Sequence, residues 1–327
     1  MTLRVLAPGA LTTVQDAGRE AFRHLGVGVA GALDAYSHAV ANLLAGNTPD
    51  AAALEITLTG PRLRFDHAAR ISLCGAHIDA RCDGVAIPTW RRVSVPAGAT
   101  LALGACRRGA RAYLAIAGGI DVPKVLGSAS TDLRGGFGGN EGRALVAGDI
   151  LQVAHRFAGI EVLHVAPWWI DPSPDVASDT PAVVRVLAGR DAVAPSGALF
   201  DVPWRVAAAS DRQGLRLQGA TLHAVDAGER ISEPVAPGTV QLPPDGQPIV
   251  LLGDAQTHGG YPRIGHVIRA DWPRLAQLRP GDAIRFRACN HAEACDAWRA
   301  RCHRLARIEL AIASRLHAEK RLRGHDA

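Results

Sequence analysis

The sequence of 327 residues predicts a mainly β protein made of two β-barrel domains, with a few short helices and a C-terminal helix. Three observations support this fold class. Short apolar segments alternate with turns rich in glycine (35 residues) and proline (20), which is typical of barrels and sandwiches. The two halves end alike, on Ala-Gly-Asp-Ile at 147–150 and Pro-Gly-Asp-Ala at 280–283, which indicates a repeat unless the turns coincide by chance. The last 37 residues have helical periodicity.

The first half contains a series of short apolar runs that we expect to form strands. Glycine, proline and aspartate separate them, as at Pro8-Gly9, so each run is expected to end at a turn. The runs are 4–6, 11–14, 54–58, 63–65, 71–74, 93–95, 101–103 and 112–117.

One helix interrupts these strands. Asp34 is a suitable N-cap, apolar residues recur at helical spacing from Tyr36 to Leu44, and Gly46-Asn47 provides a stop. In the second half, a short helix is expected over 271–278 with Asp271 as its cap.

These patterns divide the chain into four parts. We expect an N-terminal β domain over 1–155, a Pro/Asp-rich linker over 156–182, a second β domain over 183–290 and a basic amphipathic helix over 291–327. The helix carries one apolar stripe, and its arginines lie mostly off that stripe. The arginines form either a solvated face or a surface for an acidic partner. The stripe consists of Trp298, Cys302, Leu305, Ile308, Ile312 and Leu316.

Composition excludes several classes of function. The net charge is +5, but eight basic and five acidic residues after position 290 account for +3, and aromatics are only 5%, so nucleic-acid binding is disfavoured. Met1 is the only methionine, which excludes a biotin-attachment Ala-Met-Lys-Met sequence, and no phosphate-binding loop motif occurs. The six cysteines lack metal-site spacing, and neither a secretory signal nor an apolar span is visible. We therefore expect a cytoplasmic protein with reduced, mostly buried thiols and no metal.

The richest polar segment follows an apolar strand of the second half, at 249–252. Such a loop on a rigid strand is a common way to present a site, and its glycines let backbone N–H groups approach a ligand. A turn that satisfies its own hydrogen bonds is the alternative. The candidate residues in this half are Ser210, Arg212, Gln241, Asp254, Gln256, Thr257, His258, Gly259, Gly260 and Tyr261.

The first half offers a smaller set of candidates, Asp16, Arg19 and Asp34. Each has a plain structural explanation beside the functional one. Asp16 and Arg19 could pair across a turn, and Asp34 could serve only as an N-cap.

Taken together, these segments resemble the family called allophanate hydrolase subunit 2, or biotin-dependent carboxyltransferase-like, which includes 5-oxoprolinase C subunits and the regulator KipA. The resemblance covers about residues 3–287 and departs from the usual pattern at Gly28, Leu33, Gln213 and Ala255. The matching blocks are 12–19 (TTVQDAGR), 31–34 (GALD), 41–47 (ANLLAGN), 54–55 (LE), 109–120, 127–131 (GSAST), 210–214 (SDRQG), 232–233 (SE), 241–248 (QLPPDGQP), 256–262 (QTHGGYP) and 278–282 (LRPGD).

The resemblance implies two cyclophilin-like β-barrel domains and a component of an ATP-dependent 5-oxoprolinase. Such an enzyme opens 5-oxo-L-proline to L-glutamate together with a KipI-like B subunit and a LamB/YcsF-like A subunit, and ATP would act at the level of the complex. Arg212, Asp254 and Arg19 would be catalytic, and the other candidates would bind substrate. Two alternatives stay open: the carboxyltransferase component of a biotin-dependent urea or amide carboxylase or allophanate hydrolase system, and a non-catalytic KipA-like regulator that binds a kinase inhibitor.

Overall fold

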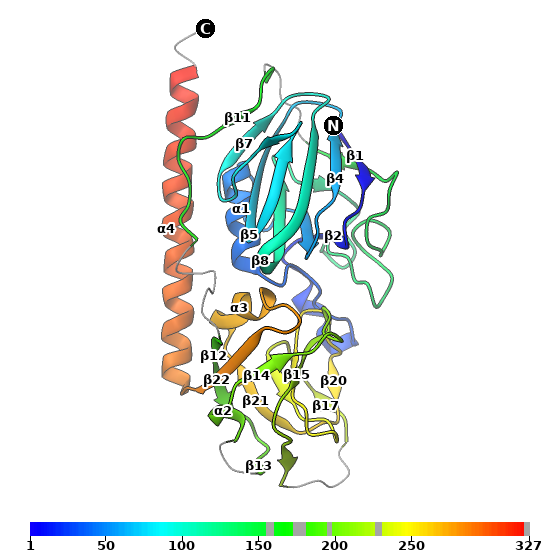
Figure 1. Ribbon diagram of the computed structural model, residues 1–327, viewed down its shortest axis with the longest axis vertical. Coiled ribbons are helices and arrows are strands. Elements are labelled where there is room, and N and C mark those ends of the chain that lie inside the picture. Colours follow the sequence, from blue (N-terminus) through cyan, green and yellow to red (C-terminus); the bar gives the residue numbers. More distant parts are fainter. Residues whose placement is uncertain (155–159, 173–180, 195–197, 226–230, 324–327) are drawn as a thin grey trace.

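The computed structural model describes residues 1–154, 160–172, 181–194, 198–225 and 231–323. It confirms a mainly β fold with a few short helices and a C-terminal helix. Figure 1 shows the strands of the first half in the upper part of the molecule and those of the second half below, with helix α4 running beside both. The proposed domain boundaries remain predictions, and residues 156–159 and 173–180 of the expected linker lie outside the described residues.

The first half forms one 11-stranded sheet, ordered β11-β7-β5-β8-β4-β1-β10-β9, with β2 and β3 branching from β8 and β6 pairing with β5. Many of its buried side chains, among them Leu54, Phe65 and Leu101, form one core, and others pack with α1 in a second cluster. The strands are β1 (Thr2–Ala7), β2 (Leu11–Gln15), β3 (Ala53–Thr57), β4 (Arg62–Phe65), β5 (Ala69–Cys82), β6 (Val85–Ala86), β7 (Arg92–Val95), β8 (Thr100–Ile116), β9 (Ile120–Asp121), β10 (Ile150–Val153) and β11 (His164–Val165).

Two predictions within this sheet were wrong in extent. Residues 101–103 and 112–117 are not separate strands but parts of the 17-residue β8, and the run 71–74 is a fragment of the 14-residue β5. Glycines in these segments do not end the strands at turns. They lie where the pairing register between β5 and β8 shifts. Gly75 has φ +96°, and a Cβ there would lie 2.5 Å from the carbonyl oxygen of Arg111, so glycine allows the two long strands to bend together.

The second half is a closed barrel ordered β12-β21-β18-β19-β15-β14-β22, as the β-rich pattern over 182–287 predicted. Its core includes the fully buried Trp204 and Phe286. The barrel strands are β12 (Ala182–Ala188), β14 (Trp204–Val206), β15 (Gly214–Gln218), β18 (Thr239–Gln241), β19 (Ile249–Leu251), β21 (Arg263–Val267) and β22 (Ala283–Ala288). Two small ribbons pair β13 (Val193–Ala194) with β16 (His223–Ala224) and β17 (Glu233–Pro234) with β20 (His258–Gly259).

Helix α1 (Ala35–Ala45) has the ends that the sequence predicted. Asp34 accepts the backbone N–H of Ser37 at 2.9 Å, and Gly46 ends the helix with φ +93°. Three of the six cysteines, Cys74, Cys82 and Cys106, are buried, so the expectation of mostly buried thiols holds for half of them. The short helices are η1 (Glu20–Leu25), α2 (Ala198–Asp201), η2 (Arg269–Asp271) and α3 (Trp272–Ala276).

Asp271 stands at the N-cap position of α3 as predicted, but the expected capping by its side chain was wrong, and the helix is shorter than the expected 271–278. Its side chain makes no capping hydrogen bond and instead accepts Arg185 Nη2 at 2.6 Å and Nε at 2.9 Å. A charged, bidentate donor from β12 is a stronger partner for this buried carboxylate than a backbone N–H.

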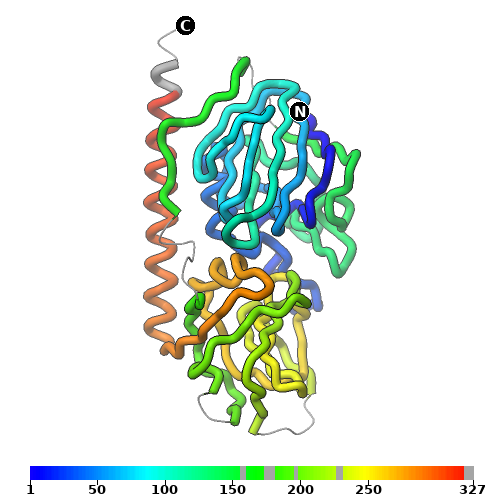
Figure 2. The backbone as a smooth tube through the Cα atoms, viewed as in Figure 1, coloured from blue at the N-terminus to red at the C-terminus, as the bar shows by residue number. Residues whose placement is uncertain are grey.

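The terminal helix α4 (His291–Arg323) is confirmed. Its apolar stripe, including Leu305 and Ile312, packs on the α1 cluster around Tyr36 and Leu44, and the tube view shows the helix passing both halves (Figure 2). Within the described residues, no helix combines the length and the apolar character needed to cross a bilayer.

If Asp271 acts as an ion-pair partner rather than as a cap, Asp271→Asn should lower the free energy of unfolding by about 1–3 kcal/mol, because asparagine caps well but cannot neutralise Arg185. Urea unfolding measures this loss. The control is Asp296→Asn, which removes an exposed pair with Arg299 and should change stability by less than about 0.5 kcal/mol. Wild-type stability in Asp271→Asn would contradict the assignment.

Candidate functional site

Loops from both halves meet at the predicted site. The backbone N–H of Ala30 donates to the carbonyl of Gly253 at 3.0 Å, which joins the segment before α1 to the loop after β19. The candidate residues Arg212 and Asp254 come from the second half, whereas Asp16, Arg19 and Asp34 come from the first. The site therefore exists only because the two halves pack together.

Arg212 is the central residue of this junction. Its Nε and Nη2 donate to the two carboxylate oxygens of Asp254 at 2.8 and 2.9 Å, Nη2 also donates to the carbonyl of Gly31 at 2.8 Å, and Nη1 pairs with Glu55. Arg212 and Asp254 are 4% and 5% exposed. Two of the three residues predicted to be catalytic thus bind each other inside the interface.

Glu55 was not among the predicted site residues, although a glutamate within the apolar run 53–57 was a usable signal. It lies on β3 and accepts the hydroxyl of Tyr113 at 2.8 Å and the backbone N–H of Leu33 at 2.9 Å. Burial opposes its ionisation, but the nearby guanidiniums of Arg212 and Arg111 outweigh burial and lower its pKa. Glu55 is therefore a buried anion that connects β3 to the second half.

Asp254 shares Arg212 with Glu55, and this shapes its ionisation. Burial raises the pKa of Asp254, and the neighbouring carboxylates Glu55 and Asp132 act in the same direction against the opposing effect of Arg212. Burial is therefore the main cause of the raised pKa of Asp254, and the nearby carboxylates add to it.

Asp34 binds across the same interface. Besides capping α1, it accepts Ser37 Oγ at 2.7 Å and Nε2 of Gln277 at 2.8 Å. Gln277, which sequence reasoning missed, also accepts the backbone N–H groups of Ala110 and Arg111 at 3.1 Å. Burial raises the pKa of Asp34. The capping interpretation of Asp34 is confirmed, and its contact with substrate stays a prediction.

Asp16 is held by the glycine-rich loop that precedes the end of the first half. It accepts the hydroxyls of Ser128 and Ser130 at 2.6 Å each and the backbone N–H of Ala129 at 2.6 Å. Burial alone would raise its pKa, but these hydrogen bonds outweigh burial and lower it. No ion pair joins Asp16 to Arg19 among the described residues, so pairing across the turn does not explain the two.

Arg19 retains an unused donor. Its guanidinium donates to the carbonyls of Ser130 and Val125 and lies 4.9 Å from the ring centroid of Phe137, but Nη1 has no hydrogen-bond partner within the described part of the chain. The residue is only 2% exposed. Burial lowers its pKa, against the attraction of Asp132, Asp16 and Asp254. Arg19 therefore lies near three carboxylates and keeps one buried N–H without a partner in the described part of the chain.

The loop after β19 extends the site along the barrel. Gln256 Nε2 approaches Gln241 Oε1 at 3.4 Å, and Thr257 Oγ1 lies 3.0 Å from His258 Nδ1. Gln241 is 1% exposed, yet its Nε2 has no hydrogen-bond partner among the described residues. Gly259 belongs to the ribbon strand β20, next to Gly260 and the exposed Tyr261.

Ser210 is not brought to the Arg212 junction by any bond described. Its Oγ donates to the carbonyl of Arg216 at 3.3 Å and accepts the backbone N–H of Arg216 at 3.0 Å, which closes a turn before β15. Among the described residues, no three His, Cys, Asp or Glu side chains are grouped to hold a metal ion.

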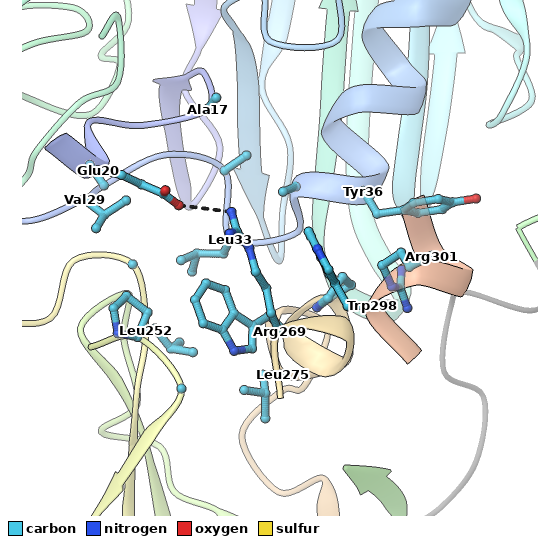
Figure 3. A pocket seen from close by; sticks show the side chains of 18 of the residues that line it. Ala17, Glu20, Val29, Leu33, Tyr36, Leu252, Arg269, Leu275, Trp298 and Arg301 are labelled. Atoms are coloured by element: carbon cyan, nitrogen blue, oxygen red, sulfur yellow. Dashed lines mark hydrogen bonds and ion pairs between the residues drawn. The ribbon is translucent and has the colours of Figure 1, made fainter. Parts of the chain in front are cut away.

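An apolar cavity of about 170 Å³ lies behind the site loops, between the two halves and α4 (Figure 3). Leu33, Leu252 and Leu275 contribute to its wall, and Gly253 places it next to Asp254. At its edge Arg269 pairs with Glu20 at 3.0 Å and stacks over Trp298, 4.9 Å from the ring centroid. This cavity therefore borders the candidate site with a mostly apolar wall.

Comparisons with known proteins place these features in context. A family model described as the carboxyltransferase domain, subdomain A and B, matches residues 25–288. The C subunit of 5-oxoprolinase from Escherichia coli (strain K12) is 42% identical over 301 residues, 90% of this chain and 94% of that protein.

Two solved structures are similar over most of the chain. TTHA0988 has a TM-score of 0.75 at 38% identity and matches 88% of this chain. K. lactis urea amidolyase has a TM-score of 0.83 at 29% identity and matches 94% of this chain. The matches span 55% of the TTHA0988 chain and 20% of the urea amidolyase chain, so both are longer proteins.

Removing the charge of Glu55 should destabilise the fold, because Glu55→Gln leaves the buried Arg212 with one carboxylate partner. We expect a loss of about 3–5 kcal/mol in the free energy of unfolding, measured by urea titration. Glu141→Gln removes an exposed partner of Arg143 and serves as the control, with a change below about 0.5 kcal/mol. A similar loss in both variants would argue against the junction.

Asp16 should stabilise the fold in a pH-dependent way. Its folded pKa is lowered, so its contribution is fully present above the unfolded value of about 3.9 and is lost as pH falls through the folded pKa. Unfolding measurements across this range should show Asp16→Asn about 1–3 kcal/mol less stable than wild type at pH 7. The difference in the free energy of unfolding between wild type and Asp16→Asn should become smaller in acid. A difference that stays constant with pH would contradict this account.

Proposed function

The chain belongs to the family of the carboxyltransferase domain, subdomain A and B, and we propose that it is the C subunit of an ATP-dependent 5-oxoprolinase. The observation that carries this proposal is its 42% identity to the E. coli protein of that name over 94% of the latter's length. The match spans 90% of this chain and 94% of that protein, whereas the similarity to urea amidolyase concerns a fifth of a larger protein. The chain would act with A and B subunits to open 5-oxo-L-proline to L-glutamate.

The chemistry needs a group that makes the lactam carbonyl reactive. In the proposed reaction, the lactam oxygen attacks the γ-phosphorus of ATP and releases ADP. Water then adds to the carbonyl carbon, the ring C–N bond breaks as its nitrogen takes up a proton, and a second water hydrolyses the resulting acyl phosphate to glutamate and phosphate. The phosphoryl group carries negative charge beside the lactam oxygen as it is transferred, and a fixed cationic donor in a site shielded from water stabilises that charge. Arg19 fits this role because its Nη1 has no protein partner within the described residues.

Asp254 is the proposed acceptor for the lactam N–H. Each of its carboxylate oxygens takes one bond from Arg212, and a carboxylate oxygen can accept a further bond. Arg212 would then contribute to catalysis by fixing Asp254. The remaining predicted residues would bind substrate, with Gln241 the best supported because its buried amide nitrogen lacks a partner in the described structure.

A second candidate function is a carboxyltransferase for urea or a related amide. The TM-score of 0.83 to urea amidolyase over 94% of this chain favours it. Urea and 5-oxoproline share the N–C=O unit, so the same donors and acceptors could serve both. This reaction would need a biotinylated carrier from another chain, because Met1 is the only methionine here.

The proposal is tested by measuring glutamate release from 5-oxoproline and ATP, with this chain alone and then mixed with candidate A and B subunits encoded beside it. We expect turnover only in the mixture. A stable complex without turnover would overturn the proposal. Carboxylation of urea by the chain with a biotinylated carrier would favour the second function, and activity in neither assay would favour a KipA-like regulator.

In the active complex, Arg19→Gln should lower kcat by about a hundredfold with a smaller change in KM, because the lost interaction forms mainly in the transition state. Arg19→Lys should recover part of the rate, since it keeps the positive charge. Arg4→Gln removes an arginine that is 53% exposed and pairs with Asp66, and it should keep wild-type kinetics. Equal kcat in Arg19→Gln and wild type would remove Arg19 from the mechanism.

A further inference from the structure

A second cavity, separate from the apolar one, lies on the barrel beside the β17–β20 ribbon. Its volume is about 370 Å³, within the range of small-molecule sites, which is about 300–1,000 Å³. Three arginines line it, together with Gly189, Pro234, Val235, Ala236, Thr239, Gly265 and His266.

The three arginines come from separate parts of the chain. Arg23 belongs to η1 of the first half, Arg190 follows β12, and Arg263 begins β21. Arg23 donates to the carbonyl of Val235 and so brings the first half to the barrel. The cavity is thus assembled by tertiary packing and has no continuous sequence motif.

The positive charge here is only partly balanced. Glu233 pairs with Arg263 and with Arg190, the latter at 3.1 Å, and Asp191 accepts the backbone N–H of Arg263 at 2.6 Å. Among the described residues, three guanidiniums therefore lie near two carboxylates. Because each guanidinium carries five N–H donors in a planar fork, a group of arginines suits a phosphate oxygen cluster better than a neutral ligand.

The cavity also adjoins the predicted substrate loop. Glu233 and Pro234 of β17 pair with Gly259 and His258 of β20, and the backbone N–H of Val235 donates to the carbonyl of Thr257 at 2.9 Å. An anion in the cavity would therefore lie beside the ribbon strand that is bonded to the segment following Gln256.

We propose that this cavity binds the polyphosphate chain of a nucleoside triphosphate through Arg23, Arg190 and Arg263. The choice of a nucleotide rests on the proposed function, which needs a phosphoryl donor near the lactam. The binding of a polyphosphate rests on the arginines alone. Glu233 would act as a competing anion that a phosphate group displaces from Arg190 and Arg263.

The test is calorimetric titration of the full chain with sodium tripolyphosphate and with ATP. Arg190→Gln and Arg263→Gln should each weaken binding by about tenfold, the effect of losing one charge-assisted hydrogen bond. Arg107→Gln is the matched control, since Arg107 and its partner Asp79 are 65% and 47% exposed, against 67% and 42% for Arg190 and Glu233. The control should bind like wild type.

Glu233→Gln provides a test of opposite sign. Removing the competing carboxylate should strengthen binding by about fivefold, because a repulsive charge next to the phosphate is lost. If Glu233 only held Arg190 and Arg263 in place, Glu233→Gln would instead weaken the binding of the probes. Melting temperatures of all four variants should be compared with wild type, so that a folding defect is not mistaken for lost affinity.

Several results would overturn the inference. The first is that neither tripolyphosphate nor ATP binds. The second is that wild type, Arg190→Gln and Arg263→Gln bind with equal affinity. The third is that tripolyphosphate binds and ATP does not. Glutamate release by the complex, with no ATP binding to this chain, would leave the proposed function intact and place the nucleotide on another component of the complex. ATP binding that depends on these arginines, in a chain whose complex makes no glutamate, would support the cavity and remove the oxoprolinase assignment.

Discussion

The buried guanidinium of Arg212 is the interaction on which the arrangement of the two halves depends. It binds a carboxylate from each half, Asp254 and Glu55, and the carbonyl of Gly31. Burying these charged groups costs desolvation free energy. Their mutual attraction offsets that cost only when the hydrogen-bond geometry is favourable. Glu55 and Gly31 belong to the first half, whereas Asp254 belongs to the same half as Arg212, so a docking of the sheet on the barrel that brings both first-half acceptors to Arg212 is favoured.

This junction also fixes the loops that carry the proposed site. Gly31 precedes α1, and Asp254 follows the barrel strand β19, so both loops are tied to one side chain. Gln277 adds a second connection between Asp34 and β8. Arg19 Nη1 and Gln241 Nε2 are two of the buried side-chain atoms without a hydrogen-bond partner among the described residues, and buried polar atoms normally find partners.

The two cavities differ in the ligands that their walls suit. The apolar cavity lies behind the loops with Leu33 and Leu252 and borders α4, whereas the arginine-lined cavity lies beyond the β17–β20 ribbon. The loop with Gln256 and Thr257 lies next to the second of these and carries the polar groups suited to a small amide.

Local features were determined by the sequence itself. The caps of α1, the extent of α4 and most short strands follow from neighbouring residues, because capping and periodicity act within one or two turns. The candidate residues Arg212, Asp254, Asp16 and Arg19 were also visible as polar groups in turn-rich segments. Tertiary structure decided what local patterns could not, such as the continuity of β8 through its glycines and the pairing of Asp271 with Arg185. Glu55 and Arg212 are 157 residues apart, so only the packing of the two halves makes them partners.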